Sequence, residues 1–434
     1  MPESKAEPEW GAFVAIDWAD EKHCWKLKPA DSEQCERSEL KNTPEALDVW
    51  AAELRKRFGP RPVAVCLEQS RGPLVYALSK YSHLVLYPVH SATSASLRAA
   101  FHPSGSKSDP SDCDLLLDLL LKHRDRLRRL DPETTETRLL QRLVEQRRRL
   151  VDERTAHSNR LTAWLKMYFP QVLDWIDDID SPLGCDFLRR WPTLEQAQRA
   201  RPQTLRQFFR DHNCRSEQRI EERVEAISQA VPAVTDEALL QAGPAIAEAM
   251  TGILEALTRG IAELDKRIQA VTGAHAELRL FVDLPGAGPV LLPRLLAAFG
   301  SKRERFGSAQ ELESYSGIAP VRESSGHTSW VHFRRSCPKF LRQTFHEFAS
   351  HSIQKSSWAR AFYQSQIEKG KGHHAAVRAL AFKWIRILFR CWKSGQPYDE
   401  STYLAALQRH HSPLPTRIGC IQVAGFSKPA LKNP

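Results

Sequence analysis

Residues 11–29 read GAFVAIDWADEKHCWKLKP and predict the first strands of an α/β sheet. The apolar stretches GAFVAID and HCWKLKP flank a polar turn near Ala19–Glu21, which favours a β-hairpin. Further along, the strand-like runs PVAVCLE and HLVLYPV alternate with segments of helical periodicity up to about residue 125. A hairpin followed by alternating strands and helices is typical of a mixed-direction α/β sheet, which we expect over residues 1–130.

Carboxylates mark the ends of these predicted elements. Asp17 closes the first apolar stretch and Glu68 closes PVAVCLE, so each lies at or near the end of a strand. Asp109 and Asp112 lie three residues apart at the start of a predicted helix and share one of its faces. Carboxylates brought from separate elements to one sheet edge can hold divalent metal ions, and a Mg²⁺ pair clamps the attacking and leaving oxygens of a phosphoryl transfer.

Each of these acids also has a purely structural interpretation. The stretch DPSD (109–112) is a good helix start, with Asp at the N-cap and Pro at the first helical position. Asp17 suits a turn, and Glu68 suits a solvated strand end. The combination of all four acids nevertheless favours a ribonuclease H-like metal site. The sequence alone does not exclude three neighbouring acids as alternatives: Asp20, Glu21 and Asp114.

Composition narrows the class of protein. The chain has 434 residues, enough for two or three domains, and its 42% apolar residues support hydrophobic cores. Its net charge is +10 and its pI is about 9.2, which favours a polyanionic partner. The polar N-terminus argues against a signal peptide, and no apolar run approaches the ~20 residues that span a bilayer. Nine scattered cysteines without a CxxC pair argue against structural zinc and suit a reducing cytoplasm, so we expect a cytoplasmic protein without a membrane partner.

Residues 131–275 predict a helical middle region. A long charged helix is expected over about 133–170, and a second over about 236–272. The first has an apolar stripe made of Leu139, Leu143, Leu150, Leu161 and Leu165. The pair favours an antiparallel coiled-coil arm for oligomerisation or, equally on periodicity alone, an ordinary helical bundle. A mainly α-helical third domain is expected over 276–398, and the Pro-, Lys- and Ser-rich tail 399–434 is expected to be poorly ordered.

The third domain opens with LPGAGP (284–289), which resembles the hairpin of a helix-hairpin-helix element. Gly286 and Gly288 would let the backbone approach a nucleic-acid phosphate, and the helix that follows would offer free N–H groups to it. The alternative is a tight turn before a packed helix.

A serine pair and a basic segment follow. Ser324-Ser325-Gly326 precedes Arg334, Arg335, Lys339 and Arg342. A serine hydroxyl acts as a nucleophile only when it is activated, and surrounding cations would stabilise charge on a transferring phosphate. The alternative is a common polar turn. Lys369 and Lys371 begin KGKGHHAAVRALAFKW, which predicts a core helix with a basic approach to nucleic acid; the adjacent His373 and His374 make a poor metal pair.

Taken in order, IDWAD, CLEQS, KSDPSD, the long charged helix, LPGAGP, YSGIAPVRESSG and KFLRQTF resemble one family. It comprises the insertion-sequence transposases with a DEDD, RuvC-like N-terminal domain and a C-terminal serine domain, which are related to the Piv/MooV-type DNA invertases. Its members are known as bridge-RNA-guided recombinases. The resemblance covers residues 11–395 and places the family's four acids on Asp17, Glu68, Asp109 and Asp112. It places the nucleophile on Ser325, with Ser324 as the near neighbour.

The resemblance implies a Mg²⁺ site, with two metals possible, and a serine that forms a covalent DNA intermediate. It implies a dimer or tetramer in which acids and serine come from different subunits. DNA (donor ends and target) and a structured noncoding guide RNA are the implied partners, in the nucleoid-associated cytoplasm of a bacterium. The runner-up is a metal-dependent nuclease or Holliday-junction resolvase, and further alternatives are an invertase without guide RNA and a non-enzymatic nucleic-acid scaffold.

Overall fold

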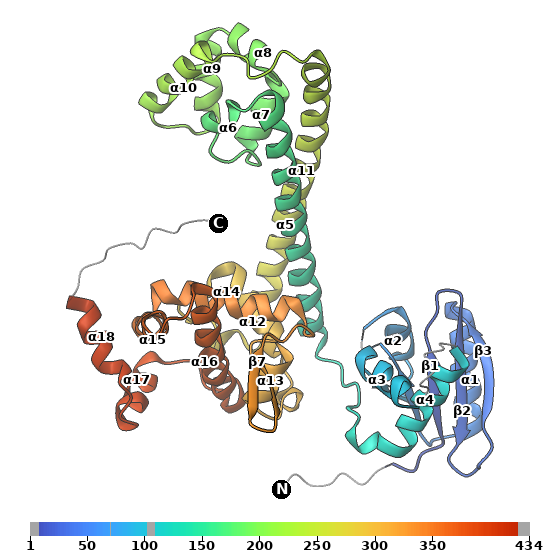
Figure 1. The fold of residues 1–434 in the computed structure, drawn as a ribbon. Coiled ribbons are helices and arrows are strands. Elements are labelled where there is room, and N and C mark those ends of the chain that lie inside the picture. Colours follow the sequence, from blue (N-terminus) through green and yellow to red (C-terminus); the bar gives the residue numbers. More distant parts are fainter. Residues whose placement is uncertain (1–7, 70, 102–108, 424–434) are drawn as a thin grey trace. The chain divides into compact units, whose positions relative to one another are not determined.

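The computed structural model describes residues 8–69, 71–101 and 109–423, with the side chains of Asp109 and of residues 419–423 left out (Figure 1). The chain divides into two compact units, residues 1–132 and 133–434. The first boundary lies close to the predicted one at residue 130. The helical middle and the C-terminal region, which the sequence predicts as separate domains, fall within the second unit.

The first unit is built on a five-stranded sheet in the order β3-β2-β1-β4-β5. Its strands are β1 (Ala12–Asp17), β2 (Lys22–Pro29), β3 (Glu36–Lys41), β4 (Val63–Leu67) and β5 (Leu84–Pro88). β1, β2 and β3 pair antiparallel, whereas β1, β4 and β5 pair in parallel, so the predicted mixed sheet is confirmed. The edge strand β3 is missed by the sequence analysis because only Leu40 of its six residues is buried.

Helices cover both faces of this sheet. They are α1 (Pro44–Phe58), α2 (Pro73–Leu78), α3 (Ser91–Phe101), α4 (Asp109–His123) and the short 3₁₀-helix η1 (Arg124–Arg126). Alternate residues of β1 and β4 pack against α1 and α2, while the residues between them pack against α4. Every residue of β4 is therefore buried, which explains why its sequence VAVCL is continuously apolar.

The second unit contains a long arm formed by α5 (Thr135–Tyr168) and α11 (Glu237–Gly273), which lie side by side (Figure 1). The helices are antiparallel, since Thr137 near the start of α5 contacts His275 just after α11, while Tyr168 at its end packs on Gly243. Leu161 and Leu165 are buried as the apolar stripe predicts. Leu139 is exposed, and its neighbour Leu140 takes the buried place.

Five short helices join the distal ends of the arm and form a tip with its own aromatic core. They are α6 (Val172–Trp175), α7 (Pro182–Arg190), α8 (Leu194–Arg199), α9 (Pro202–Asp211) and α10 (Glu217–Gln229). Phe187 contacts Trp191, Phe208 and Phe209 at ring-centroid distances of 5.2–6.2 Å. The tip thus corresponds to the region 182–232 that the sequence marks as irregular and helical.

The proximal end of the arm belongs to the C-terminal core, because Leu140, Val144 and Ile268 are buried with residues of the C-terminal helices. This shared core explains why the domain boundary predicted near residue 275 does not separate two compact units. The C-terminal elements are η2 (Leu278–Leu280), α12 (Gly288–Phe299), η3 (Arg303–Arg305), α13 (Ala309–Tyr315), β6 (Val321–Ser325), β7 (Thr328–His332), α14 (Lys339–Lys355), α15 (Ser357–Glu368), α16 (His373–Ser394), α17 (Glu400–Arg409) and α18 (Leu414–Val423).

The expectation of a poorly ordered tail over 399–434 is wrong for most of that range, which forms α17 and α18. Asp399 caps α17 by accepting a hydrogen bond from the Ser401 backbone N–H at 2.9 Å. Tyr403 and Leu404 pack against the C-terminal core, and Leu414 is buried. Residues 424–434 lie outside the described part of the chain. Among the helices described, none combines the length and the apolar run that a bilayer crossing requires.

Candidate active site

Two of the predicted catalytic acids lie next to each other at the ends of two neighbouring parallel strands. β1 and β4 pair with Ile16 opposite Leu67, so Asp17 and Glu68 are the next residues along the two strands. Because side chains alternate across a sheet, both acids fall on the face that α4 covers. Burial raises the pKa of the Cys66 thiol to about 12, and the Glu68 carboxylate adds to this shift, in agreement with a shared face.

The start of α4 lies beside these strand ends. Asp112, in the first turn of α4, is only 2% exposed. Cys113 donates from Sγ to the carbonyl oxygen of Cys24 at 3.1 Å, and Cys24 is the β2 residue paired with Asp17. The structure therefore brings Asp17, Glu68 and Asp112 to one edge of the sheet. Asp109 is the first residue of α4, but its side chain lies outside the described residues.

A cation lies among these acids. Arg98, on α3, places Nη2 2.6 Å from Asp112 Oδ1 and 3.9 Å from Glu68 Oε1. Within the described residues, no three Asp, Glu, His or Cys side chains are arranged to hold a metal ion. The carboxylate oxygens themselves are the ligands that Mg²⁺ prefers, so the donor set fits this metal while the side chains here hold a guanidinium.

Arg98 is not among the site residues predicted from the sequence. A signal for it was present, because Arg98 is the only charged residue in SATSASLRAAF, a helix that otherwise has small or apolar side chains. A buried carboxylate such as Asp112 needs a paired cation or a metal, and the lone arginine of the neighbouring helix is a candidate partner.

The three alternative acids have other surroundings. Asp114 Oδ1 accepts hydrogen bonds from Lys26 Nζ at 2.6 Å and from Arg37 Nη2 at 2.5 Å. Burial acts to raise the pKa of Asp114, but these two cations lower it overall. Asp20 and Glu21 are exposed in the turn between β1 and β2. Asp114 thus ties α4 to β2 and β3, and the turn residues lie outside the acid cluster.

The predicted serine lies at the tip of an exposed β-hairpin. Ser325 ends β6 and pairs with Thr328, which begins β7, so Gly326 and His327 form a two-residue turn. Gly326 has a φ of 56°, a left-handed conformation that favours glycine in such turns. Both Ser324 and Ser325 are exposed. The hairpin agrees with the polar-turn interpretation of SSG, and it also presents the serine hydroxyls to a substrate.

The hairpin separates the two serines. Cross-strand partners share a face, so Ser325 lies with Thr328, whereas Ser324 lies opposite Ser329 on the other face. Arg322 donates from Nε to Ser329 Oγ at 3.1 Å, on the face of Ser324. In the part of the chain that the structure describes, neither Ser324 nor Ser325 has a hydrogen-bonded base, so activation would have to come from groups outside the hairpin.

The two glycines of the GAGP turn differ in their surroundings. Gly286 has a φ of 85°, and a Cβ there would lie 2.8 Å from the backbone carbon of His351 on α14. Gly288 has a φ of 56°, is exposed and has open space around it. Packing against α14 therefore accounts for Gly286, and Gly288 is the glycine available to an approaching phosphate. The element that precedes the turn is the 3₁₀-helix η2, in place of the α-helix of a helix-hairpin-helix.

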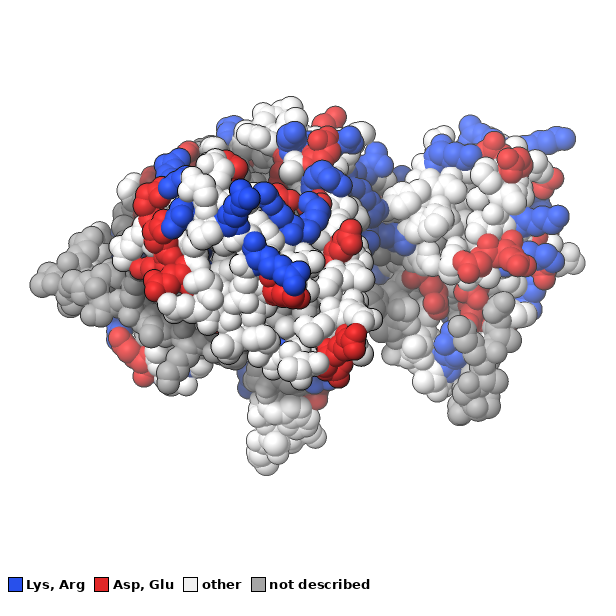
Figure 2. All heavy atoms as spheres, turned by 90° about the horizontal axis from the view of Figure 1, so that it is seen from above, with Lys and Arg blue, Asp and Glu red and all other residues white. Residues whose placement is uncertain are grey.

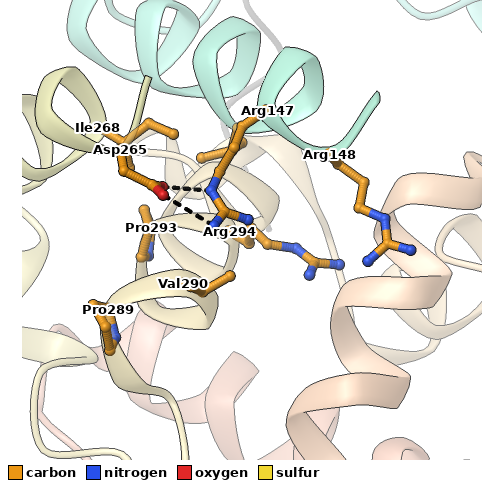
Figure 3. Close-up of a pocket in the computed structure, with 9 residues that line it drawn as sticks. Arg147, Arg148, Asp265, Ile268, Pro289, Val290, Pro293 and Arg294 are labelled. Atoms are coloured by element: carbon orange, nitrogen blue, oxygen red, sulfur yellow. Dashed lines mark hydrogen bonds and ion pairs between the residues drawn. The ribbon is translucent and has the colours of Figure 1, made fainter. Parts of the chain in front are cut away.

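A pocket beside this turn is lined by three arginines, Arg147 and Arg148 from α5 and Arg294 from α12 (Figure 3). Each is paired: Arg147 Nη2 lies 3.1 Å from Asp265, and Glu347 accepts from Arg294 Nη1 at 2.5 Å and from Arg148 Nη1 at 3.3 Å. Burial lowers the pKa of Arg294 despite its carboxylate partner. The Arg147–Asp265 pair joins the two arm helices, whereas Glu347 on α14 pairs with both α5 and α12, and we therefore interpret the pocket as structural.

The predicted nucleic-acid-binding cations fall into two groups. Arg335, Lys339, Lys369 and Lys371 are exposed. Arg334 and Arg342 are half-buried and support the chain after β7, because Arg334 Nε donates to the carbonyl of Ala319 and Arg342 Nη1 donates to the carbonyl of Arg334.

Two family models match the chain. Residues 14–170, which include the acid cluster, match one described as a transposase of the DEDD, IS110 type. Residues 278–364, which include the GAGP turn and the serine hairpin, match one described as the transposase IS116/IS110/IS902 family.

Curated relatives include proteins similar over nearly their whole length. The mini-circle putative transposase for IS117 of Streptomyces coelicolor is 27% identical over 91% of this chain and 97% of its own length. An uncharacterised 43.6 kDa protein of insertion element IS110, from the same organism, is 25% identical over 90% of this chain and 96% of its own. The pilin gene-inverting protein of Moraxella bovis is 29% identical over 32% of this chain and 45% of its own.

Proposed function

We propose that this chain, whose residues 14–170 and 278–364 match transposase models of the IS110 and IS116/IS110/IS902 types, is an IS110-family transposase that cuts and rejoins DNA. Asp17, Glu68, Asp109 and Asp112 form a Mg²⁺-dependent site, and Ser325 is the nucleophile. The observation that supports this most is the meeting of Asp17, Glu68 and Asp112 at one sheet edge, although they are far apart in sequence.

Mg²⁺ bound by these carboxylates would stabilise negative charge on the phosphate under attack. The carboxylates would orient the phosphodiester, and their fixed positions on strand ends and on the first turn of α4 make them a rigid platform. Asp112 supplies a buried oxygen donor, whereas Asp17 and Glu68 are partly exposed and reach the substrate side.

The Ser325 oxygen forms a bond to phosphorus, and the bond between phosphorus and one strand end breaks. The serine proton finishes on the released strand end, which becomes a hydroxyl, and the other end remains joined to Ser325 as a phosphoester. A hydroxyl from a different strand end then forms a bond to the same phosphorus, and the bond between phosphorus and the Ser325 oxygen breaks. The proton of that hydroxyl finishes on Ser325, which is restored. The number of phosphoester bonds is unchanged, so the exchange needs no external energy source.

We further propose that acids and serine act together across subunits of a dimer or tetramer, with the arm as a contact between copies. A structured noncoding RNA would select the donor and target DNA by base pairing, leaving the protein to contact backbone. The positive net charge of the chain suits two nucleic-acid partners.

The experiment is a strand-exchange assay with the full-length protein, Mg²⁺, element-end DNA and transcript of the flanking noncoding region. Denaturing gels before and after protease digestion reveal protein joined to DNA. Ser325→Ala should abolish the adduct and the exchange, while Ser324→Ala, on the opposite face of the hairpin, should retain both. Cutting that persists in Ser325→Ala would identify a nuclease or resolvase that uses water. Asp17→Asn with Glu68→Gln should abolish all cutting, and normal recombination by that protein would favour a scaffold.

Site-specific inversion is the second candidate, because the pilin gene-inverting protein is among the relatives. The strand chemistry would be the same, but the two sites would lie on one DNA molecule and no RNA would be needed. Recombination that is unaffected by ribonuclease treatment, on a plasmid with two inverted sites, would favour this function over guided transposition.

A further inference from the structure

The positive charge of the chain is concentrated in one segment. Residues 333–394 contain 13 Lys and Arg but only two acids, Glu347 and Glu368, a net charge of +11 against +10 for all 434 residues. Both acids are engaged elsewhere, since Glu347 pairs with Arg294 and Glu368 pairs with Arg417, each at 2.5 Å. No carboxylate of this segment is therefore left to neutralise its other cations.

The tip of the arm provides a contrast. Seen from above, Lys and Arg side chains lie beside Asp and Glu side chains on the face that includes the tip (Figure 2). Arg206 pairs with Glu221 and Arg210 with Glu217, each at 2.7 Å. Such neutralised pairs suit a solvated surface, whereas residues 333–394 have only two acids of their own for 13 cations.

Within residues 333–394, two packed helices bring four cationic or titratable side chains together. Arg342 and His346 lie one turn apart on α14, and His374 and Arg378 lie one turn apart on α16. The rings of His346 and His374 are 5.8 Å apart. Burial lowers the pKa of His346, and the charge of Arg378 lowers it further, so the Arg378 guanidinium lies close to the His346 ring.

An aromatic ring completes the cluster. Phe333, directly after β7, has both guanidiniums against its ring, with Arg342 Cζ 4.5 Å and Arg378 Cζ 4.6 Å from the ring centroid. Burial lowers the pKa of Arg378, and the charge of Arg342 lowers it further. Two like charges held over one ring repel each other, and the ring offsets this only in part.

Several donors of this cluster lack acceptors. Within the described residues, Arg378 makes no side-chain hydrogen bond or ion pair, and Arg342 uses only Nη1, toward the Arg334 carbonyl at 3.2 Å and Cys337 Sγ at 3.5 Å. A guanidinium has five N–H donors, so most of those on the two arginines are available to a ligand. An anion with several oxygens would accept from both guanidiniums and remove their repulsion.

We propose that Arg342 and Arg378, held over Phe333, bind a backbone phosphate of the DNA strand on which the transposase acts. Guanidiniums match phosphate oxygens in pairs, which a single ammonium group does not. Phe333 directly follows β7, and β7 pairs with β6, which ends at Ser325. A DNA strand bound at Phe333 is therefore held at a fixed position relative to the serine hairpin. Because the site is continuous with the serine hairpin, we infer that the bound phosphate belongs to the DNA strand that is cut and not to the guide RNA. The inference rests on the proposed function for the identity of the strand, but not for the presence of a phosphate site.

The test measures the affinity of the full-length protein for a labelled DNA duplex and a labelled RNA duplex, both of arbitrary sequence, over a series of salt concentrations. Backbone contacts do not depend on sequence, so these probes are adequate. Arg342→Gln/Arg378→Gln should weaken DNA binding at least about ten-fold and reduce the slope of log affinity against log salt by about one, as expected for the loss of one phosphate contact. Arg390→Gln, an exposed arginine on the same α16, is the control for loss of charge and should change DNA affinity less than about two-fold.

Thermal unfolding distinguishes a ligand site from a structural one. The single variant Arg378→Gln removes one of the two repelling charges and leaves the Arg342 hydrogen bonds in place. It should leave the melting temperature unchanged or raise it, whereas a structural role of Arg378 would lower it. Arg342→Lys/Arg378→Lys retains charge and should restore the salt slope with only part of the affinity. Unchanged DNA affinity in the double Gln variant, or loss confined to the RNA duplex, would overturn the proposal. A wild-type protein that binds DNA through these arginines but forms no Ser325 adduct would contradict the proposed function and leave the phosphate site standing.

Discussion

Arg98 donates to Asp112 Oδ1 from Nη2 at 2.6 Å and from Nε at 2.7 Å, so two N–H groups on one edge of the guanidinium share a single carboxylate oxygen. Asp112 is 2% exposed and would be costly to leave without a cation. Arg98 also lies 3.9 Å from Glu68, a second acid of the proposed metal site. The arginine thus neutralises the same oxygens that a metal ion would require.

Arg98→Gln should separate the stabilisation of Asp112 by Arg98 from the competition of Arg98 with a metal ion. Loss of the guanidinium leaves Asp112 buried and unpaired, so we expect the metal-free first unit to lose about 3 kcal/mol of stability. Added Mg²⁺ should then restore more stability to the variant than to the wild type, because the metal no longer competes with an internal cation. Melting temperatures over a Mg²⁺ titration measure both effects.

Lys56→Gln, an exposed cation on α1, is the matched control and should behave as wild type in this titration. If Arg98→Gln melts like the control and responds to Mg²⁺ no more strongly, then Arg98 neither stabilises Asp112 nor competes with a metal.

Gly286→Ala and Gly288→Ala should differ although both glycines have positive φ. A Cβ at position 286 meets the α14 backbone at 2.8 Å, whereas one at 288 meets nothing within 4 Å. We expect Gly286→Ala to destabilise the second unit by about 2–4 kcal/mol, from strain plus overpacking, and Gly288→Ala by about 1 kcal/mol from strain alone. Urea unfolding followed by tryptophan fluorescence compares them, and equal losses would contradict the packing role of Gly286.

Features of the molecule that depend on residues close together in the sequence could be predicted, and features that depend on distant residues could not. The apolar runs that end at Asp17 and Glu68 predict their strands, because a buried central strand consists of consecutive apolar residues. The convergence of Asp112 with them follows from the helix start, and the family resemblance points to the same residues. Strand β3 and the helices of the tail were missed because few of their residues are buried.

The arginine contacts could not be predicted in the same way. Arg98 and Asp112 are 14 residues apart on different helices, and their pairing depends on how α3 and α4 meet. Arg342 and Arg378 are likewise brought to one ring only by the packing of α14 against α16. Sequence identifies these residues as cations, but only tertiary structure shows which cations have a carboxylate and which do not.

Glu347→Gln tests the ion-pair cluster that joins the arm to the C-terminal helices. The substitution keeps the shape of the side chain but leaves Arg294, 4% exposed, and Arg148 without their shared carboxylate. We expect a loss of about 3 kcal/mol for the second unit, since a buried charge loses its partner. Glu368→Gln breaks an exposed pair with Arg417 and should cost about 0–1 kcal/mol. Similar urea midpoints for the two variants would show that the cluster contributes little to stability.

The contribution of Asp180, in the loop before α7, to the stability of the tip should increase as the pH falls from 7 toward 4. Burial, followed by a hydrogen bond and charge repulsion from Asp178, raises the pKa of Asp180 to about 6, while Arg154 opposes the shift. An acid whose pKa is higher in the folded state than in the unfolded state binds protons preferentially when folded. Its contribution is therefore complete below its ordinary pKa near 4 and is lost as the pH rises through about 6.

Asp180→Asn mimics the protonated acid and should raise the melting temperature at pH 7 while leaving it nearly unchanged at pH 4. The difference between variant and wild type is the relevant measurement, since other carboxylates titrate in both proteins. Asp177→Asn removes an exposed carboxylate of the same loop, 3.6 Å from Arg223, and is the control for loss of an acid at this position in the chain. A constant difference between Asp180→Asn and wild type from pH 4 to 7 would mean that Asp180 has an ordinary pKa, and that repulsion from Asp178 is relieved by solvent.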